Sequence, residues 1–393
     1  MISLVEHQAT ELPRDALTEV QGLLLQHTYS RVISLDFPHA GNNHQWRLTP
    51  KGYVGFIPLG KQQIQIKPKV SLANLFRMLE SAFDLVDFRD DLVMMGDIDD
   101  LFSSLAKILS DRVHELAKRG IERRYLSIQE PLTTMRGRLL VNERSRRSWM
   151  VELPCDFQEH TSDIAENQII AWTLSRILRS GICRADVYPS VQAAFRSLLP
   201  FCEVKSVPIV EFDDFIYDRL NFSYQSIHAL CRLFLELAGP THEIGDRSML
   251  PFLVDMNRLF ERFVSAWLKA NLPSDFIVET KRPMTFSEIH DLRYQADIVL
   301  FRRGSNKPLA VIDTKYKAAG LPESGDVHQI IHYAMMLNTA RAFLVYPQTI
   351  ARKLDEKSGG IRLQNVAFDL SQILDSAGNA LCTQLLADIG TDA

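Results

Sequence analysis

The fold is decided by the stretch Tyr294-Gln-Ala-Asp297-Ile-Val-Leu-Phe-Arg-Arg-Gly304-Ser-Asn-Lys-Pro308-Leu-Ala-Val-Ile-Asp313-Thr-Lys315-Tyr-Lys. Residues 294–303 and 309–318 are rich in β-branched and aromatic side chains, and residues 304–308 supply turn chemistry between them, so the stretch predicts a β-hairpin. Asp313 and Lys315 are two residues apart and therefore project from the same face of their strand.

Two carboxylates stand where this hairpin should be apolar. Asp297 lies inside Gln-Ala-Asp-Ile-Val-Leu-Phe and Asp313 follows Leu-Ala-Val-Ile. An unpaired carboxylate buried there would cost several kcal/mol or be driven neutral, and a bound cation would remove that penalty. The alternative for any one of these residues is a buried Asp–Lys ion pair or hydrogen bonding at a strand end. Both acids together with Lys315 favour a metal-dependent hydrolytic site.

The flanking segments extend the pattern. Residues 255–268 carry apolar residues at helical spacing with Glu261 beside the stripe, and residues 325–337 predict a second helix that carries Gln329 and Tyr333. Strands are expected near residues 276–279 and 342–346. This order predicts an α/β (α+β) fold with a central mixed sheet flanked by helices. A solvated helix face is the alternative for Glu261 and Gln329.

These residues resemble the PD-(D/E)xK nuclease superfamily. Asp297 corresponds to its first acid, Asp313-Thr314-Lys315 to the (D/E)xK element and Glu261 to the helix-borne acid. Gln329 and Tyr333 match a QxxxY element, while the leading Pro is absent. More of the chain resembles the McrC family, the nuclease subunit of a modification-dependent (type IV) restriction system. That resemblance also includes four further blocks, namely Gly52–Gly60 with Ile64–Lys69, Arg136-Gly-Arg138-Leu, Ile164–Ile170 and Leu259–Phe263.

The nuclease motif implies hydrolysis of a phosphodiester. The carboxylates of Asp297 and Asp313, with the backbone carbonyl of Thr314, would offer an all-oxygen shell suited to Mg²⁺ or Mn²⁺. Lys315 would orient or activate the attacking water and offset charge on the phosphate. Glu261 would bind a second metal or hold a water. Gln329 would hydrogen-bond a phosphate or a water, with Tyr333 supporting it from the next helical turn.

The McrC resemblance also implies a partner, an AAA+ GTPase ring of the McrB type, a hexamer that recognises methylated DNA. The N-terminal half of this chain would enter the pore of the ring and stimulate its GTPase while the C-terminal domain cuts DNA. Two other functions stay open. One is a stand-alone site- or structure-specific endonuclease whose N-terminal half binds DNA directly, and the other is a non-enzymatic adaptor that keeps the sheet only for docking.

Composition bounds the remaining possibilities. With 393 residues, 46% of them hydrophobic, the chain is long enough for two or three domains. Its five cysteines are scattered without a C-x-x-C pair, which favours neither a disulfide framework nor a zinc site. The first residues lack a basic segment followed by an apolar run, and no apolar stretch approaches the length of a membrane span. A cytoplasmic protein without a membrane partner is expected.

The basic residues of the chain are concentrated in one segment. The net charge is −4, which does not suit a protein that coats DNA by itself. Residues 118–150, however, hold nine basic side chains against three acidic ones. The candidate patch for DNA or for an acidic partner within this segment comprises Arg136, Arg138, Arg144, Arg146 and Arg147, with a solvated arginine face as the third possibility.

Loop signals divide the chain near residues 239–245. Residues 1–245 are expected to form a partner-interaction region, β-rich over 1–160 and helical over 161–245, and residues 246–393 the nuclease domain. Helices are predicted over 71–86, 97–118 and 219–238, and Asp163-Ile-Ala-Glu166 resembles a capping box. The segment Gly55-Phe-Ile-Pro-Leu-Gly60-Lys61-Gln62 approaches a phosphate-binding loop, but a strand pattern follows it, so a β-hairpin turning at Gly60-Lys61 is predicted instead.

Overall fold

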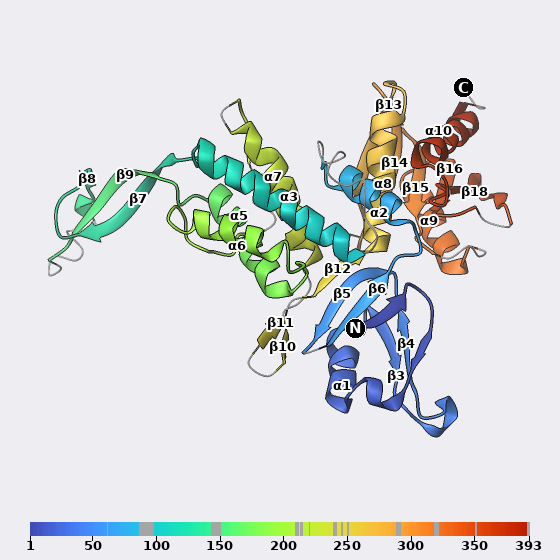
Figure 1. The fold of residues 1–393 in the computed structure, drawn as a ribbon. Coiled ribbons are helices and arrows are strands. Elements are labelled where there is room, and N and C mark those ends of the chain that lie inside the picture. The colour runs from blue at the N-terminus through green and yellow to red at the C-terminus, as the bar shows by residue number, and fades with distance from the viewer. Residues whose placement is uncertain are drawn as a thin grey trace. The chain divides into compact units, whose positions relative to one another are not determined.

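The computed structural model of the chain describes residues 1–393 apart from short stretches. Outside the description lie residues 61, 86–97, 143–150, 209–211, 213–214, 220, 239–241, 245–246, 250, 288–291, 318–321, 350–351 and 391–393. The chain forms two compact units (Figure 1). Unit 1 combines Met1–Leu101 with Gly239–Ala393, and unit 2 is Phe102–Ala238. The chain therefore leaves unit 1 and returns to it.

The N-terminal part of unit 1 contains two small sheets, with strand orders β1-β6-β5-β12 and β2-β4-β3. Their elements are β1 (Ile2–Val5), β2 (Thr10–Leu12), α1 (Glu19–Thr28), β3 (Ile33–Asp36), β4 (Trp46–Pro50), β5 (Tyr53–Leu59), β6 (Gln62–Lys67) and β12 (Phe252–Asp255). β12 comes from the far side of unit 2 in the sequence and pairs antiparallel with β5. At Gly55, with φ +135°, a Cβ would lie 2.1 Å from the Phe252 carbonyl oxygen, so glycine permits this close pairing.

The predicted hairpin at the segment that approaches a phosphate-binding loop is confirmed. β5 and β6 pair antiparallel, from Gly55 with Ile66 to Leu59 with Gln62. Gly60 follows β5 with φ +71°, a conformation that favours glycine. A phosphate-binding loop requires a strand followed by a helix N-terminus, and a strand stands here in place of the helix.

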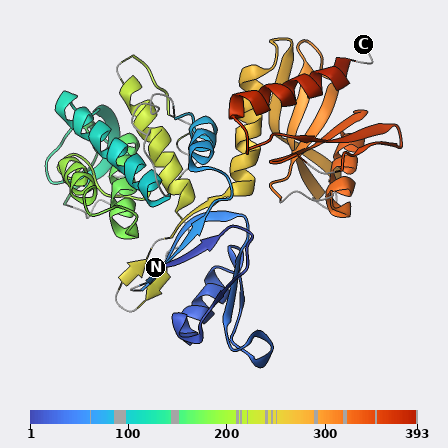
Figure 2. The same ribbon diagram turned by 45° about the vertical axis from the view of Figure 1, so that its right-hand side comes forward.

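The C-terminal part of unit 1 contains a six-stranded sheet of order β13-β14-β15-β16-β18-β17 (Figure 2). Its strands are β13 (Phe276–Ser287), β14 (Leu292–Arg302), β15 (Pro308–Thr314), β16 (Arg341–Tyr346), β17 (Asp355–Ser358) and β18 (Ile361–Ala367). β13, β14 and β15 are antiparallel, whereas β16 runs parallel to both β15 and β18. The predicted mixed sheet and its hairpin are thus confirmed.

Helices bury both faces of this sheet. They are α8 (Met256–Asn271), α9 (Ser324–Met336) and α10 (Leu374–Gly390). α2 (Leu72–Ala82), from the N-terminal part, packs against α8. Ile330 and Ala334 of α9 share one buried cluster with Val299 and Val311 of the hairpin. From α8, Trp267 packs edge-on against Phe368 at 5.5 Å between ring centroids. Burial of these apolar side chains holds the strands in place.

α2 ties the N-terminal part to the C-terminal part. The side-chain amide of Asn74 donates to the carbonyl of Leu370 at 2.8 Å, and Arg77 pairs with Asp375 at 2.9 Å. These contacts and the β5–β12 pairing lie inside unit 1, which therefore includes residues from both sides of the boundary expected near residue 245. A short pair of strands, β10 (His242–Ile244) and β11 (Arg247–Met249), stands close to that boundary.

Unit 2 combines helices with a three-stranded sheet of order β7-β9-β8. Its elements are α3 (Ile98–Arg119, which begins in unit 1), β7 (Arg124–Leu132), β8 (Arg138–Leu139), β9 (Leu153–Thr161), α5 (Ala165–Ser180), α6 (Tyr188–Leu198) and α7 (Phe222–Leu237). A buried polar network joins α5 to α7, because Tyr224 donates to the side chain of Asn167 at 2.8 Å and His228 bonds the Glu166 carbonyl at 3.0 Å. No described helix is both long and apolar enough to cross a bilayer.

The predicted capping box at residues 163–166 is wrong. Ile164 is the N-cap of α5 and supplies no capping side chain. Asp163 instead accepts hydrogen bonds from the amide of Gln168 and the backbone N–H of Glu203, and Glu166 pairs with Arg124 at 2.5 Å. Tertiary partners engage the two carboxylates that would have capped the helix. The helix ends at Gly181, whose φ of +75° is the left-handed conformation common at helix C-termini.

Candidate active site

Asp297 and Asp313 come from neighbouring strands of the hairpin. The register pairs Val299 with Val311 and Ile298 with Ile312, so the next pair along the strands is Asp297 with Asp313. Asp297 reaches across to β15, where its Oδ2 accepts a hydrogen bond from the backbone N–H of Thr314 at 3.2 Å. Because side chains alternate along a strand, both carboxylates face the same side as Val299 and Val311, which α9 covers.

Burial makes both carboxylates costly to ionise. Asp313 is 1% exposed, and burial raises its pKa to about 7, with a further increase from the charge of Asp297 and an opposing decrease from Lys315. Burial also raises the pKa of Asp297, which is half-buried, although the Thr314 hydrogen bond and the Lys315 charge lower it. Two ionised carboxylates that repel each other in a buried environment cost free energy unless a cation neutralises part of their charge.

Lys315 supplies positive charge at this point. Its Nζ lies 2.8 Å from Asp313 Oδ2 and 3.7 Å from Asp326 Oδ1. Its backbone N–H donates to the carbonyl of Val345 at 2.9 Å, which fixes the residue just beyond the end of β15. Burial by itself lowers the pKa of Lys315, but Asp313, Asp326 and Asp297 together raise it, so the side chain is held as a cation.

Gln329 and Tyr333 extend this contact along α9. Lys315 donates from Nζ to Gln329 Oε1 at 3.0 Å, and Gln329 Nε2 donates to the hydroxyl oxygen of Tyr333 at 2.9 Å. Both ends of the Gln329 amide are therefore engaged, which sets its orientation. The helical spacing of four residues between Gln329 and Tyr333 makes the second bond possible.

Asp326 and Tyr346 also border the site, although the sequence reasoning gave neither a role. Asp326 is buried in the first turn of α9 and accepts from Lys317 Nζ at 2.9 Å. The Tyr346 hydroxyl is buried and makes no hydrogen bond with a described residue. Burial raises the pKa of Tyr346, and the charges of Asp326 and Asp313 raise it further. Lys317 follows Lys315 by two residues and pairs with Asp326. A second lysine at this spacing was the feature of the sequence that could have indicated a further acidic partner.

Glu261 lies on α8, away from the hydrogen bonds that join the other residues. It is half-buried, and burial followed by the charge of Asp297 raises its pKa, so the two acids are within electrostatic reach. Glu261 itself makes no hydrogen bond or ion pair with a described residue. Among the described residues, no group of three His, Cys, Asp or Glu side chains is arranged to hold a metal ion. The structure thus brings together Asp297, Asp313 and Lys315 and leaves Glu261 at the margin.

The donor set still fits a hard cation. Asp313 Oδ2 is buried and, although Lys315 Nζ is near, the approach is poorly directed and the oxygen accepts no hydrogen bond from any described residue. Mg²⁺ takes oxygen ligands and commonly needs only one or two protein carboxylates, since waters complete its shell. Asp297, Asp313 and the Thr314 carbonyl are therefore the residues that could hold Mg²⁺ or Mn²⁺.

The arginines expected to form a basic patch are only partly described. Arg136 stacks over Phe157 at 4.2 Å from the ring centroid and lies 3.7 Å from Glu159, and Arg138 opens β8 opposite Asp156. Arg144, Arg146 and Arg147 fall outside the described residues. The same sheet region exposes several large apolar side chains, namely Tyr125, Leu126, Met135, Val141 and Val151.

A family model and two solved structures that match this chain name the same restriction system. A family model described as "McrBC 5-methylcytosine restriction system component" matches residues 48–347. One solved neighbour is a chain of a refined half-complex from the tetradecameric assembly of Thermococcus gammatolerans McrB AAA+ hexamers with bound McrC. It is 17% identical, with a TM-score of 0.58, and the alignment covers 98% of this chain and 99% of that chain.

A second solved neighbour comes from the cryo-EM structure of the Thermococcus gammatolerans McrBC complex. It is 19% identical, with a TM-score of 0.44, over 70% of this chain and 88% of that chain. At these identities the likeness of the first neighbour concerns the fold alone. No curated protein matches the chain.

Proposed function

Because the chain belongs to the McrBC 5-methylcytosine restriction family, we propose that it is the DNA-cutting subunit of a methylation-dependent restriction complex. The observation that carries this proposal is the set of Asp297, Asp313 and Lys315, which stand together at the end of the β14–β15 hairpin. Acids in an apolar sheet contribute little to the fold, so their presence suggests chemistry. The reaction would be the metal-dependent hydrolysis of a DNA phosphodiester, carried out in the cytoplasm.

The residues of the chain divide the work of hydrolysis. Asp297, Asp313 and the Thr314 carbonyl would hold Mg²⁺, whose chemistry when bound is to offset phosphate charge and lower the pKa of a water. Lys315 would donate a hydrogen bond from Nζ to the attacking water or to a phosphate oxygen. Gln329 holds Nζ in place, and Tyr333 holds Gln329. Preorganised donors of this kind stabilise the charge that develops in the transition state.

We further propose that the chain works with an AAA+ GTPase hexamer. The neighbour with a similar fold is described as McrB AAA+ hexamers with bound McrC, which supports a partner of the same kind here. In unit 2, apolar side chains are exposed on and beside the β7-β9-β8 sheet, such as Tyr125 of β7 at 68% and Val151, just before β9, at 89%. Figure 1 shows this sheet as a part of unit 2. Exposed apolar side chains gathered in one region mark an interaction surface. Residues 1–245 would bind the ring, enter its pore and stimulate its GTPase.

A cleavage assay tests this function. Methylated and unmethylated plasmid would be incubated with the chain and Mg²⁺, with and without an McrB-type AAA+ protein of the same organism and GTP. We expect cleavage of methylated plasmid only when all components are present. Cleavage by the chain alone would favour the stand-alone endonuclease, and an intact plasmid under every condition would contradict the proposed activity.

A further inference from the structure

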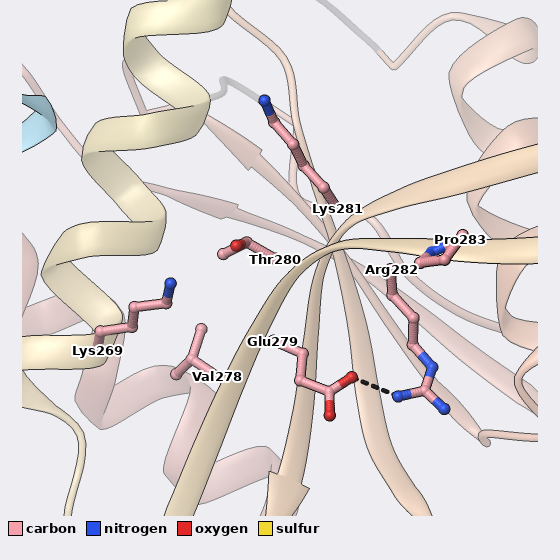
Figure 3. A pocket seen from close by; sticks show the side chains of 7 residues that line it. All are labelled: Lys269, Val278, Glu279, Thr280, Lys281, Arg282 and Pro283. Atoms are coloured by element: carbon pink, nitrogen blue, oxygen red, sulfur yellow. Dashed lines mark hydrogen bonds and ion pairs between the residues drawn. The ribbon is translucent and has the colours of Figure 1, made fainter. Parts of the chain in front are cut away.

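A basic pocket borders the candidate active site on β13. It is an open hollow of about 530 Å³ formed by residues 278–283 of β13 and by Lys269 near the end of α8 (Figure 3). Lys269 reaches toward β13 from the helix, and Lys281 extends from the strand. Thr280, the residue before Lys281 on the strand, also lines the hollow. Figure 3 shows it between the two lysines. Two separate elements therefore each contribute a lysine to the lining of one hollow.

The pocket carries a surplus of positive charge. Its one carboxylate, Glu279, is paired with the guanidinium of Arg282, which also lies 5.0 Å from the ring of Phe301 (Figure 3). The ammonium groups of Lys269 and Lys281 are exposed and make no ion pair or hydrogen bond with a described residue. Arg282 is ion-paired, whereas neither lysine forms an ion pair with a described residue.

The register of the sheet places this charge beside the candidate catalytic acids. Thr280 pairs with Ile298 and Arg282 with Ala296, so Lys281 stands across from Asp297. The row across the three strands is thus Lys281, Asp297 and Asp313. Burial raises the pKa of Asp297 and of Glu261, and Lys281 is among the charges that lower both, which agrees with this proximity.

Lys281 also has an unusual backbone. Its φ is +54°, in the left-handed region that few residues other than glycine adopt. Such a conformation in the middle of a long strand costs free energy, and costs of this kind concentrate at functional sites. A glycine would fit the backbone better, so the lysine side chain itself has a reason to be there.

We propose that Lys281 and Lys269 bind phosphate groups of a DNA strand next to the phosphodiester that is cut, with the Thr280 hydroxyl as a further donor. This inference rests on the proposed nuclease function. Asp297, Asp313 and Glu261 repel a polyanion, so a strand needs cationic contacts beside them to settle in the site. Ammonium groups bind phosphate oxygens as point charges, and contacts of this type position the strand without reading its sequence.

Binding of a short labelled DNA duplex to the full chain tests the proposal, with a metal chelator present to prevent cleavage. Each lost phosphate contact should reduce the slope of log affinity against log salt by about 0.9. We expect Lys281→Gln to weaken binding several-fold and reduce the slope by about one contact, and the double variant with Lys269→Gln by about two. Lys307→Gln is the matched control, because it removes the same charge from the exposed hairpin turn and should change neither quantity.

Lys281→Gly separates binding from folding. Glycine accepts the left-handed backbone without strain, so the Tm of this variant should equal or exceed that of the unsubstituted chain. Its DNA affinity should still fall as in Lys281→Gln. Equal effects of Lys281→Gln and Lys307→Gln, an unchanged slope in both Lys281 variants, or no binding by the unsubstituted chain even at low salt would overturn the proposal.

These outcomes are distinct from a failure of the nuclease function. Cleavage by the assembled complex that is indifferent to Lys281→Gln would contradict only the phosphate contact. A reduced slope in a chain whose complex never cuts DNA would instead uphold the contact and contradict the catalytic role of Asp297, Asp313 and Lys315.

Discussion

Asp313 and Gln329 hold Lys315 directly and Tyr333 acts through Gln329, so their contributions to catalysis should differ in size. Asp313 pairs with its charge, Gln329 accepts its hydrogen bond and Tyr333 acts only by holding Gln329. A single hydrogen bond between neutral groups contributes about 0.5–1.5 kcal/mol. The influence of a residue on the cleavage rate should therefore decrease with its distance from Nζ.

Graded substitutions along α9 test this order. Tyr333→Phe should reduce the cleavage rate by less than about tenfold, because it removes one bond that acts through another residue. Gln329→Ala should reduce it more, since Lys315 loses its positioning contact. Single-turnover cleavage by the assembled complex measures both, with thermal unfolding as the control for folding. A larger loss in Tyr333→Phe than in Gln329→Ala would contradict the proposed chain of contacts.

Glu6 gives the stability of unit 1 a dependence on pH. It is fully buried, and burial raises its pKa from 4.5 to about 7, against the opposing effects of the Lys69 backbone N–H, the Tyr316 hydroxyl and the Lys69 charge. The Tyr316 hydroxyl donates to Glu6 at 3.2 Å, and His7 lies 3.5 Å away. The folded state therefore favours the protonated form of Glu6. The stabilisation from this preference is complete below pH 4.5, the pKa in the unfolded chain, and is lost as pH rises through about 7, the pKa in the folded chain.

Glu6→Gln should remove this loss, because glutamine resembles the protonated acid. The variant should match the unsubstituted chain at about pH 5 and be more stable by on the order of 2–3 kcal/mol at about pH 8. Thermal unfolding of both proteins across this range measures the difference. His7 is present in both proteins, so its own titration cancels to first order. A difference that does not change with pH would contradict the assignment to Glu6.

At the level of elements, local patterns in the sequence predicted the core elements around the candidate active site. Alternating apolar residues and a turn predicted the β14–β15 hairpin, and apolar residues at helical spacing predicted α8 and α9. Two strands and a helix at the C-terminal end were not predicted. β17 is exposed at all four positions, so it offers no alternation, and α10 contains a glycine that weakens its helical signal.

Non-local contacts account for what the sequence reasoning lacked at the site. β12 pairs with β5 across almost two hundred intervening residues, and no periodic pattern reports such a partner. The same holds for Asp326, whose role depends on the approach of α9 to Lys315 and Lys317. Alternation could place Asp313 and Lys315 on one face, but only the tertiary structure shows that Glu261 stands apart from them.

Two glycines in helices should respond oppositely to alanine. At Gly378 of α10, a Cβ would lie 2.1 Å from the ring of Trp267, whereas at Gly325 of α9 nothing lies within 4 Å. Gly378→Ala should therefore destabilise unit 1 by about 1–3 kcal/mol through overpacking. Gly325→Ala should be neutral or stabilising by up to about 1 kcal/mol, because alanine is the better helix former. Chemical unfolding of both variants checks the signs, and equal signs would contradict the packing of α10 on Trp267.

At the scale of the whole molecule, the compact unit that carries the candidate active site includes residues from both sides of residue 245. A chain that ends there would lack β12, which pairs with β5, and α8, which packs against α2. Residues 246–393 alone would lack α2 and β5. The expected division into residues 1–245 and 246–393 therefore does not coincide with the compact units. Unit 1 combines the N-terminal strands with the candidate active site.

Fragments should reveal this division. Residues 102–238 form unit 2 and should unfold cooperatively on their own, whereas residues 246–393 should be poorly folded because apolar surface normally covered by residues 1–101 becomes exposed. Circular dichroism and limited proteolysis of each fragment measure this. Cooperative unfolding of residues 246–393 at the stability of the full chain would contradict the role assigned to α2 and β5.

The central claim is that Asp297, Asp313 and Lys315 cut DNA, and the rate of a single round of cleavage by the assembled complex tests it most directly. Asp313→Asn and Lys315→Met should each lower that rate by roughly 10²–10⁴-fold while the variants still fold and bind the partner. Lys307→Met serves as the control and should cut normally. Cleavage at the unsubstituted rate by a folded Asp313→Asn or Lys315→Met complex would contradict the account.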